Sequence, residues 1–155
     1  MSSHYTFSLS IRLRASLTLE EVSALVYIVN GDGEAPTQLP SHFYFQKLRD
    51  LDFRKQYRDF PTGSYHSNFW ERREEGEIVE YGVSLLLPSQ KLEGVYGELF
   101  ELAQWLATIS TSIGHVGSIT CEDDGEGIPT LLFVRNNQLC VASPSDDMAI
   151  SAVPV

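Results

Sequence analysis

The densest group of side chains that could do chemistry reads Tyr-His-Ser-Asn-Phe-Trp-Glu-Arg-Arg and occupies residues 65–73. Tyrosine, tryptophan and arginine are enriched at binding hot spots, because each combines a large contact area with a polar group. On an extended strand alternate side chains share a face, which would put His66, Trp70 and Arg72 on one side and Tyr65 on the other. We name Tyr65, His66, Trp70 and Arg72 the aromatic patch, and expect it either to bind a ligand or to pack both faces of a strand.

A second candidate is the acidic loop, which we define as Glu122, Asp123, Asp124 and Glu126. Carboxylates at this density can face a cationic protein surface, or they can keep a β-hairpin loop solvated. Calcium prefers several oxygen ligands at alternate positions of a tight loop, with a glutamate at the twelfth position in the EF-hand. The segment does not continue in that way, so we expect a surface for a basic partner or a solvated loop, and no calcium site.

Other residue types that could carry catalysis or hold a cofactor are not spaced for that role. The histidines show no zinc-ligand spacing; they are His4, His42, His66 and His115. The glycine-containing stretch at residues 30–34 follows a predicted helix, whereas a phosphate-binding loop precedes one. The serines lack a G-x-S-x-G elbow, and nothing selects a pair of carboxylates. We therefore expect no catalytic residue, no metal and no cofactor.

The elements that must position these residues begin with a strand and a helix. Apolar and polar residues alternate over residues 5–13, which predicts a strand with one face packed and the other solvated. Thr18 and Glu21 form a capping-box pattern, which satisfies two backbone donors at the start of a helix. Asn30-Gly31 supplies a left-handed stop for that helix.

The rest of the chain alternates between strand and helix patterns. A hairpin should turn at residues 74–77, and Pro88 should end its second strand. Asn136-Asn137 predicts a tight turn between the last two strands, while residues 41–68 give mixed signals. The remaining predictions are strands at 67–73, 78–87, 115–122, 130–135 and 138–143, and an amphipathic helix at 92–112.

This order of elements predicts an α+β fold with an antiparallel sheet and two helices on one face. It is close to the ferredoxin-like (split βαβ) plan, with an added C-terminal β-hairpin. Residues 1–143 are expected to form a single domain, and residues 144–155 a flexible C-terminal tail. Because unrelated functions share this plan, the fold class by itself does not predict a function.

The charge balance is the most unusual property of the whole sequence. In 155 residues, 21 acidic and 11 basic side chains give a formal net charge of −10 at pH 7. Such a field repels phosphate backbones and anionic headgroups, so we expect a basic protein as partner, and neither nucleic acid nor membrane. The first residues lack a secretory-signal pattern and Cys121 and Cys140 are too few for a disulfide framework, which favours a cytoplasmic location.

Three functional hypotheses follow. The leading one is a small, acidic, non-catalytic protein-binding domain, an inhibitor or immunity-type protein that neutralises a basic partner such as a toxin. The chain is similar to bacterial immunity proteins in this general profile only, and no residue carries the similarity. One alternative is a small-molecule-binding module or enzyme with a cleft near residues 65–73. The other is a structural or assembly protein that pairs through a sheet edge.

Overall fold

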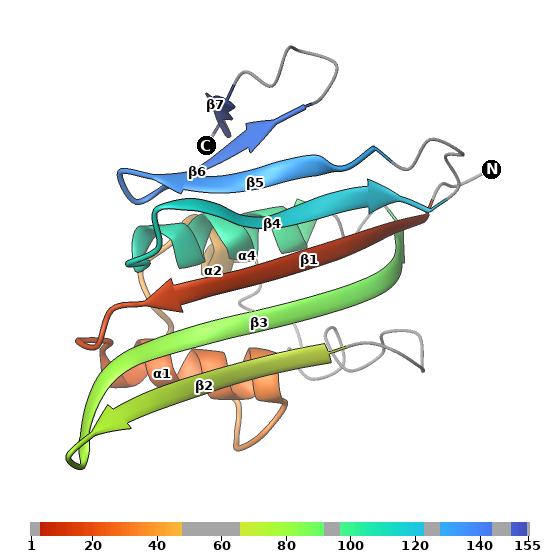
Figure 1. Ribbon diagram of the computed structural model, residues 1–155. Helices are drawn as coiled ribbons and strands as arrows, with labels where there is room; N and C mark the ends of the chain where they lie inside the picture. Colours follow the sequence, from red (N-terminus) through yellow and green to blue (C-terminus); the bar gives the residue numbers. More distant parts are fainter. Residues whose placement is uncertain (1–3, 48–65, 92–96, 123–127, 144–149, 155) are drawn as a thin grey trace.

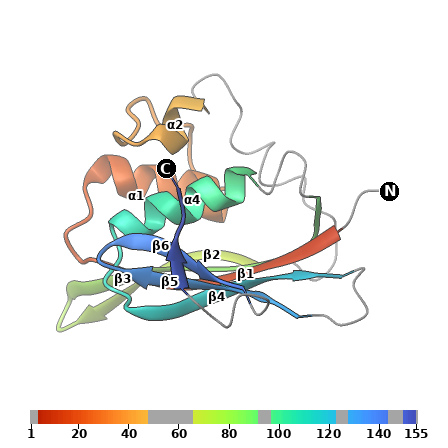
Figure 2. The same ribbon diagram turned by 90° about the horizontal axis from the view of Figure 1, so that it is seen from above.

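The computed structural model is built on one sheet with its helices on a single side (Figure 1, Figure 2). It describes residues 4–47, 66–91, 97–122, 128–143 and 150–154. The strands are β1 (His4–Leu13), β2 (His66–Glu74), β3 (Glu77–Lys91), β4 (Gly114–Cys121), β5 (Thr130–Arg135), β6 (Gln138–Ala142) and β7 (Ile150–Ala152). The helical segments are α1 (Leu19–Leu25), η1 (Val26–Asn30), α2 (Phe43–Lys47) and α4 (Gly97–Thr108). The α+β class predicted from the sequence is confirmed.

The sheet has seven strands in the order β2-β3-β1-β4-β5-β6-β7, and each runs antiparallel to its neighbours. Strand β3 lies between β1 and β2 and is antiparallel to both, so β1 and β2 are parallel to each other. The alternation predicted for the first strand is confirmed: Phe7, Leu9 and Ile11 are buried, whereas Ser10 and Arg12 are exposed. The buried side chains belong to the core cluster that they share with helix residues. The described helices lie on one face of the sheet, and the opposite face carries no described helix (Figure 2).

Helix α1 begins at the predicted capping box. The Glu21 backbone N–H donates to Thr18 Oγ1 over 3.1 Å, and the Thr18 N–H donates to Glu21 Oε1 over 2.9 Å. The predicted left-handed stop is also confirmed, since Gly31 has φ +67°. Between them the α-helix widens into the π-helical turn η1, a change that the periodicity of the sequence does not indicate.

The end of η1 is attached to the edge strand β2. The amide of Asn30 donates to the carbonyl oxygen of Phe69 over 3.1 Å and accepts from the Phe69 N–H over 2.7 Å. The hydroxyl of Ser67 donates to the carbonyl oxygen of Val29 over 2.7 Å. Asn30 thus satisfies the Phe69 backbone groups on the side of β2 away from β3, in the way that a neighbouring strand would. This contact occupies the middle of an edge that strand pairing would need.

The hairpin β2–β3 is present, but its second strand is longer than predicted. Glu75 and Gly76 form the turn with φ values of +51° and +84°, the left-handed pair of a two-residue hairpin loop. Strand β3 then continues to Lys91, so the prediction that Pro88 ends it is wrong. The register to β1 shifts between Leu87 and the residues that follow, which forms a bulge at Pro88. A bulge tolerates proline because no ladder hydrogen bond needs the missing N–H.

Helix α4 separates the sheet from the short helix α2 (Figure 2). Its predicted apolar stripe packs on the sheet, with Leu99, Leu102 and Leu106 at 1% exposure or less. Trp105 lies on another side of the helix and is also buried, because Phe45 of α2 meets it edge-on with ring centroids 4.7 Å apart. Tyr44 of α2 stacks in parallel with the same indole at 6.3 Å. The aromatic contacts therefore build a third layer from part of the segment for which the sequence gave mixed signals.

The C-terminal strands extend the sheet beyond β4. Asn136 and Asn137 form the predicted tight turn between β5 and β6, with φ values of +50° and +57°. Strand β7 pairs with β6, the Val153 N–H donates to the carbonyl oxygen of Leu139 over 3.0 Å, and Val153 is 9% exposed. Where the sequence predicts a flexible tail over residues 144–155, residues 150–153 form a paired strand and a core contact, and residues 144–149 lie outside the described residues.

Candidate functional site

The aromatic patch lies on the edge strand β2. His66, Trp70 and Arg72 pair across the hairpin with Leu86, Gly82 and Glu80, and share the sheet face opposite the helices. Tyr65 lies outside the described residues. The intervening residue Phe69 points the other way, is 8% exposed and stacks on Tyr81 at 5.4 Å, as a two-faced strand requires. The structure thus brings three of the four patch residues to one open face.

Trp70 has a packing role on that face. A Cβ at Gly82 would collide with the Trp70 ring atoms, so the indole lies directly on the glycine backbone of the neighbouring strand. An aromatic side chain that covers a strand glycine shields the ladder and replaces the packing that the glycine lacks. Trp70 remains partly exposed, so its outer surface is open to solvent or to a partner.

Arg72 belongs to a row of ion pairs. Its Nε lies 3.7 Å from Glu80 Oε1, and its Nη1 lies 2.6 Å from Glu74 Oε1. Arg12 of β1 approaches Glu80 Oε2 from the other side at 3.9 Å. Glu80 is the least exposed member of the row, with a side chain 17% exposed, while Arg72 is 51% exposed. Both arginines therefore have carboxylate partners on this face of the sheet.

The turn of the hairpin projects past the rest of the sheet and carries a concentration of carboxylates (Figure 1). Glu74, Glu75 and Glu77, with Val79, line a hollow of about 620 Å³. Glu74 pairs with Arg72, whereas Glu75 and Glu77 form no ion pair within the described residues. We name Glu74, Glu75 and Glu77 the hairpin carboxylates; they form a negative concave surface at the most prominent turn.

Of the acidic loop, only Glu122 is described. It is exposed, its carboxylate accepts from the Thr6 hydroxyl over 2.7 Å, and its N–H donates to the carbonyl oxygen of His4 over 2.8 Å. Asp123, Asp124 and Glu126 lie outside the described residues. Glu122 therefore directly follows β4 and is held to β1.

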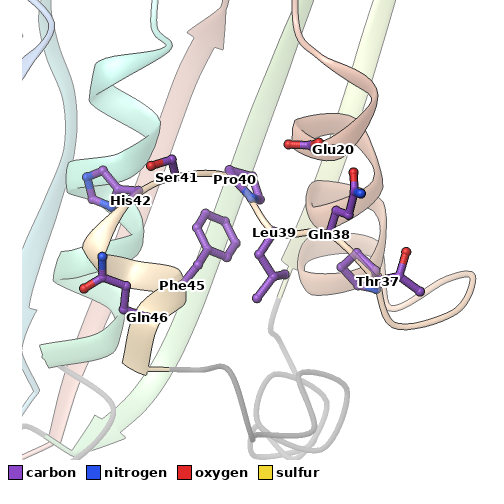
Figure 3. Close-up of a pocket in the computed structure, with 10 residues that line it drawn as sticks. Glu20, Thr37, Gln38, Leu39, Pro40, Ser41, His42, Phe45 and Gln46 are labelled. Carbon is purple, nitrogen blue, oxygen red and sulfur yellow. The ribbon is translucent and has the colours of Figure 1, made fainter.

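A hollow that sequence reasoning did not identify lies between α1 and α2 (Figure 3). It measures about 610 Å³, and we name it the α1–α2 hollow. Glu20 reaches into it from α1, the segment Thr37–Ser41 forms one wall, and Phe45 and Gln46 come from α2 (Figure 3). A neighbouring hollow of about 360 Å³ shares Glu20 and the turn at Pro40. The described residues of the aromatic patch, His66, Trp70 and Arg72, line neither hollow.

Two neighbouring glutamates of α1 lie at the two hollows, and only one of them pairs with a described cation. Glu21, 7% exposed, accepts two hydrogen bonds from Arg14 Nη2 over 3.1 and 3.3 Å, which neutralises it beside the smaller hollow. Glu20 is exposed and forms no ion pair or hydrogen bond with a described residue. Among the described lining residues, it is the one with a formal charge at pH 7.

His42 lies on the rim of both hollows and is uncharged at neutral pH. Burial lowers the pKa of its imidazole below the usual 6.5, although the nearby Glu101 acts in the opposite direction. Its Nδ1 accepts a hydrogen bond from the Tyr44 N–H over 3.1 Å, which fixes the ring at the start of α2. In α4, burial and the neighbouring carboxylate of Glu101 raise the pKa of Glu98. The rim therefore adds no cation to the hollow at neutral pH.

The described residues bring no set of three or more His, Cys, Asp or Glu side chains together in a metal-binding arrangement. Cys121 and Cys140 are free thiols. Among the described helices, none has the length and apolar character needed to cross a bilayer.

No protein-family model, curated protein or solved structure matches the chain.

Sequence signals for the α1–α2 hollow exist, but they are indirect. Trp105 lies outside the apolar stripe that covers the sheet, so a second element should pack on it. The segment Phe43-Tyr44-Phe45 is a candidate for that element. Pro36 and Pro40 restrict the chain that leads to it. These signals place α2 near α4, but they do not bring Glu20 to the same hollow as Gln46, because that arrangement depends on how α1 and α2 sit on the sheet.

Proposed function

We propose that this chain is a non-catalytic domain that binds a basic partner protein, as an inhibitor or immunity-type protein does. The observation that supports it most directly is the group of hairpin carboxylates, which line a hollow of about 620 Å³ and include two side chains without an ion pair among the described residues. A negative concave surface on a projecting turn suits a lysine or arginine side chain on a partner. The net charge of −10 adds a long-range field of the same sign.

The fold and the compartment complete the proposal. We propose a ferredoxin-like variant, because β1 and β2 are parallel with β3 between them, and β5, β6 and β7 extend the sheet past β4. We propose the cytoplasm as the compartment, because the two cysteines are free.

The experiment that tests the proposed function starts with affinity capture from the native host. The full chain is immobilised, captured proteins are identified, and the purified partner is titrated with the wild type and with the variant Glu75→Lys/Glu77→Lys. We expect a partner of high isoelectric point whose affinity falls at least about tenfold in the variant, since like charges across an interface repel.

A matched control carries the same change of charge elsewhere. Asp32 and Glu34 are exposed residues in the loop after η1, so Asp32→Lys/Glu34→Lys changes the net charge equally without touching the hairpin. Equal losses in both variants would show that the hairpin is not the contact surface. A partner whose binding neither salt nor charge reversal weakens would contradict the proposed function.

A further inference from the structure

The α1–α2 hollow has a lining that selects among ligand classes by charge. Its described lining contains one carboxylate, Glu20, and no lysine or arginine. Arg14 lines the neighbouring hollow and is held by Glu21 at 3.1 Å. A phosphate or carboxylate would meet the negative charge of Glu20, which pairs with no described residue, so a cationic ligand suits this lining better than an anionic one.

The neutral groups of the lining favour one kind of cation. The side chains of Gln38, Ser41 and Gln46 offer amide and hydroxyl oxygens as acceptors, and none of these three forms a hydrogen bond with a described residue. Leu39 and Pro40 add apolar surface beside them (Figure 3). A guanidinium group is planar, carries five N–H donors and is weakly hydrated, so it uses several oxygen acceptors and an apolar wall together. An ammonium group is compact and strongly hydrated and carries three donors, so it gains less from a spread of acceptors beside an apolar wall.

We infer that the α1–α2 hollow is a binding site for an alkylguanidinium group, supplied by an arginine side chain of the basic partner. The inference rests on the proposed function for the source of the arginine, but the site itself does not depend on the hairpin carboxylates. Glu20 pairs with the guanidinium, Gln38 and Gln46 accept further N–H bonds, and Leu39 with Pro40 contacts the alkyl stem. His42 on the rim adds no positive charge at neutral pH, because burial lowers the pKa of its imidazole.

The test uses argininamide as the probe and the full chain as the receptor. Titration followed by amide chemical shifts should give saturable changes, weakened by Glu20→Gln, at the first turn of α1, at residues 37–42 and at Gln46. Lysinamide should bind more weakly, since its ammonium group makes fewer contacts. The variant Glu20→Gln should lower the affinity for argininamide by about two- to fivefold, the range of an exposed ion pair.

The variant Asp32→Asn removes the same charge from an exposed residue that lines neither the hollow nor the hairpin, and it should leave argininamide binding unchanged. Equal weakening by Asp32→Asn and Glu20→Gln would overturn the site, because only the overall field would then act. The absence of saturable shifts at the residues of the hollow would overturn it as well. Argininamide binding weakened by Glu20→Gln, with no basic protein captured, would support the guanidinium site while contradicting the proposed function. A captured partner that binds Glu20→Gln like the wild type would overturn the arginine contact and leave the proposed function standing.

Discussion

The position of Trp70 on the open sheet face depends on the absence of a side chain at Gly82. The variant Gly82→Ala should displace the indole and destabilise the protein by about 1–3 kcal/mol, the usual cost of overpacking. In a Trp70→Ala background the same substitution should cost much less, because the collision is gone. Urea unfolding of the two single variants and the double variant measures this coupling, and additive costs would show that the ring is not held by the glycine.

Gly117 provides the comparison for that cycle. A Cβ at Gly117 would collide with the backbone oxygen of Ser8 on the neighbouring strand, so no side-chain truncation can relieve it. Gly117→Ala should therefore destabilise more than Gly82→Ala, since backbone must move. Both effects are invisible in the sequence, where the two residues are ordinary strand glycines.

His42 makes stability depend on pH in a direction that its environment fixes. Burial lowers the pKa of the folded-state imidazole below its usual 6.5, so the unfolded chain binds the proton more readily. The contribution of neutral His42 to stability is present above pH 6.5 and is lost as the pH falls through the lowered folded-state pKa. In His42→Asn, an amide oxygen can still accept from the Tyr44 N–H, and this pH dependence should be absent.

The measurement is the free energy of unfolding of both proteins across that pH range. The difference between the two curves reports the imidazole together with its electrostatic interaction with Glu101. Curves that stay parallel from neutral to acidic pH would contradict the burial of His42.

At the scale of single elements, the start of α1 offers the clearest prediction. Thr18→Ala removes the oxygen that accepts the Glu21 N–H and should cost about 1 kcal/mol of stability, as loss of an N-cap does. Thr37→Ala removes an exposed hydroxyl without a described partner and should stay within about 0.5 kcal/mol of wild type. Chemical denaturation measures the free energy of unfolding of both variants. Equal losses would show that the Thr18 cap does not stabilise the helix.

Elements whose cause is local could be predicted from the sequence. The capping box at Thr18, the stop at Gly31 and the turn at Asn136-Asn137 each depend on a few neighbouring residues. The extension of β3 past Pro88 could not be predicted, because it depends on a bulge against β1, a strand far away in the sequence. The same holds for β7, whose pairing is decided by β6 and the core.

Candidate sites follow the same division. The face shared by His66, Trp70 and Arg72 follows from the period of a strand, and the structure places them as expected. Their partners could not be predicted, because Glu80 and Gly82 meet them only through the hairpin register. The α1–α2 hollow is lined by two separate stretches of the chain, Glu20 in α1 and residues 36–46, and it has no local motif.

At the scale of the whole molecule, the proposed function depends on charge. We propose that a chain with a net charge of −10 presents the unpaired carboxylates of the β2–β3 turn to a basic protein. The most direct test measures the affinity of the captured partner for wild type and for Glu75→Lys/Glu77→Lys at rising salt. From about 0.1 M to about 1 M NaCl the screening length falls from roughly 10 Å to roughly 3 Å, so wild-type affinity should drop steeply and the variant's should be low throughout. Affinity that is independent of salt and equal in both proteins would contradict the central claim.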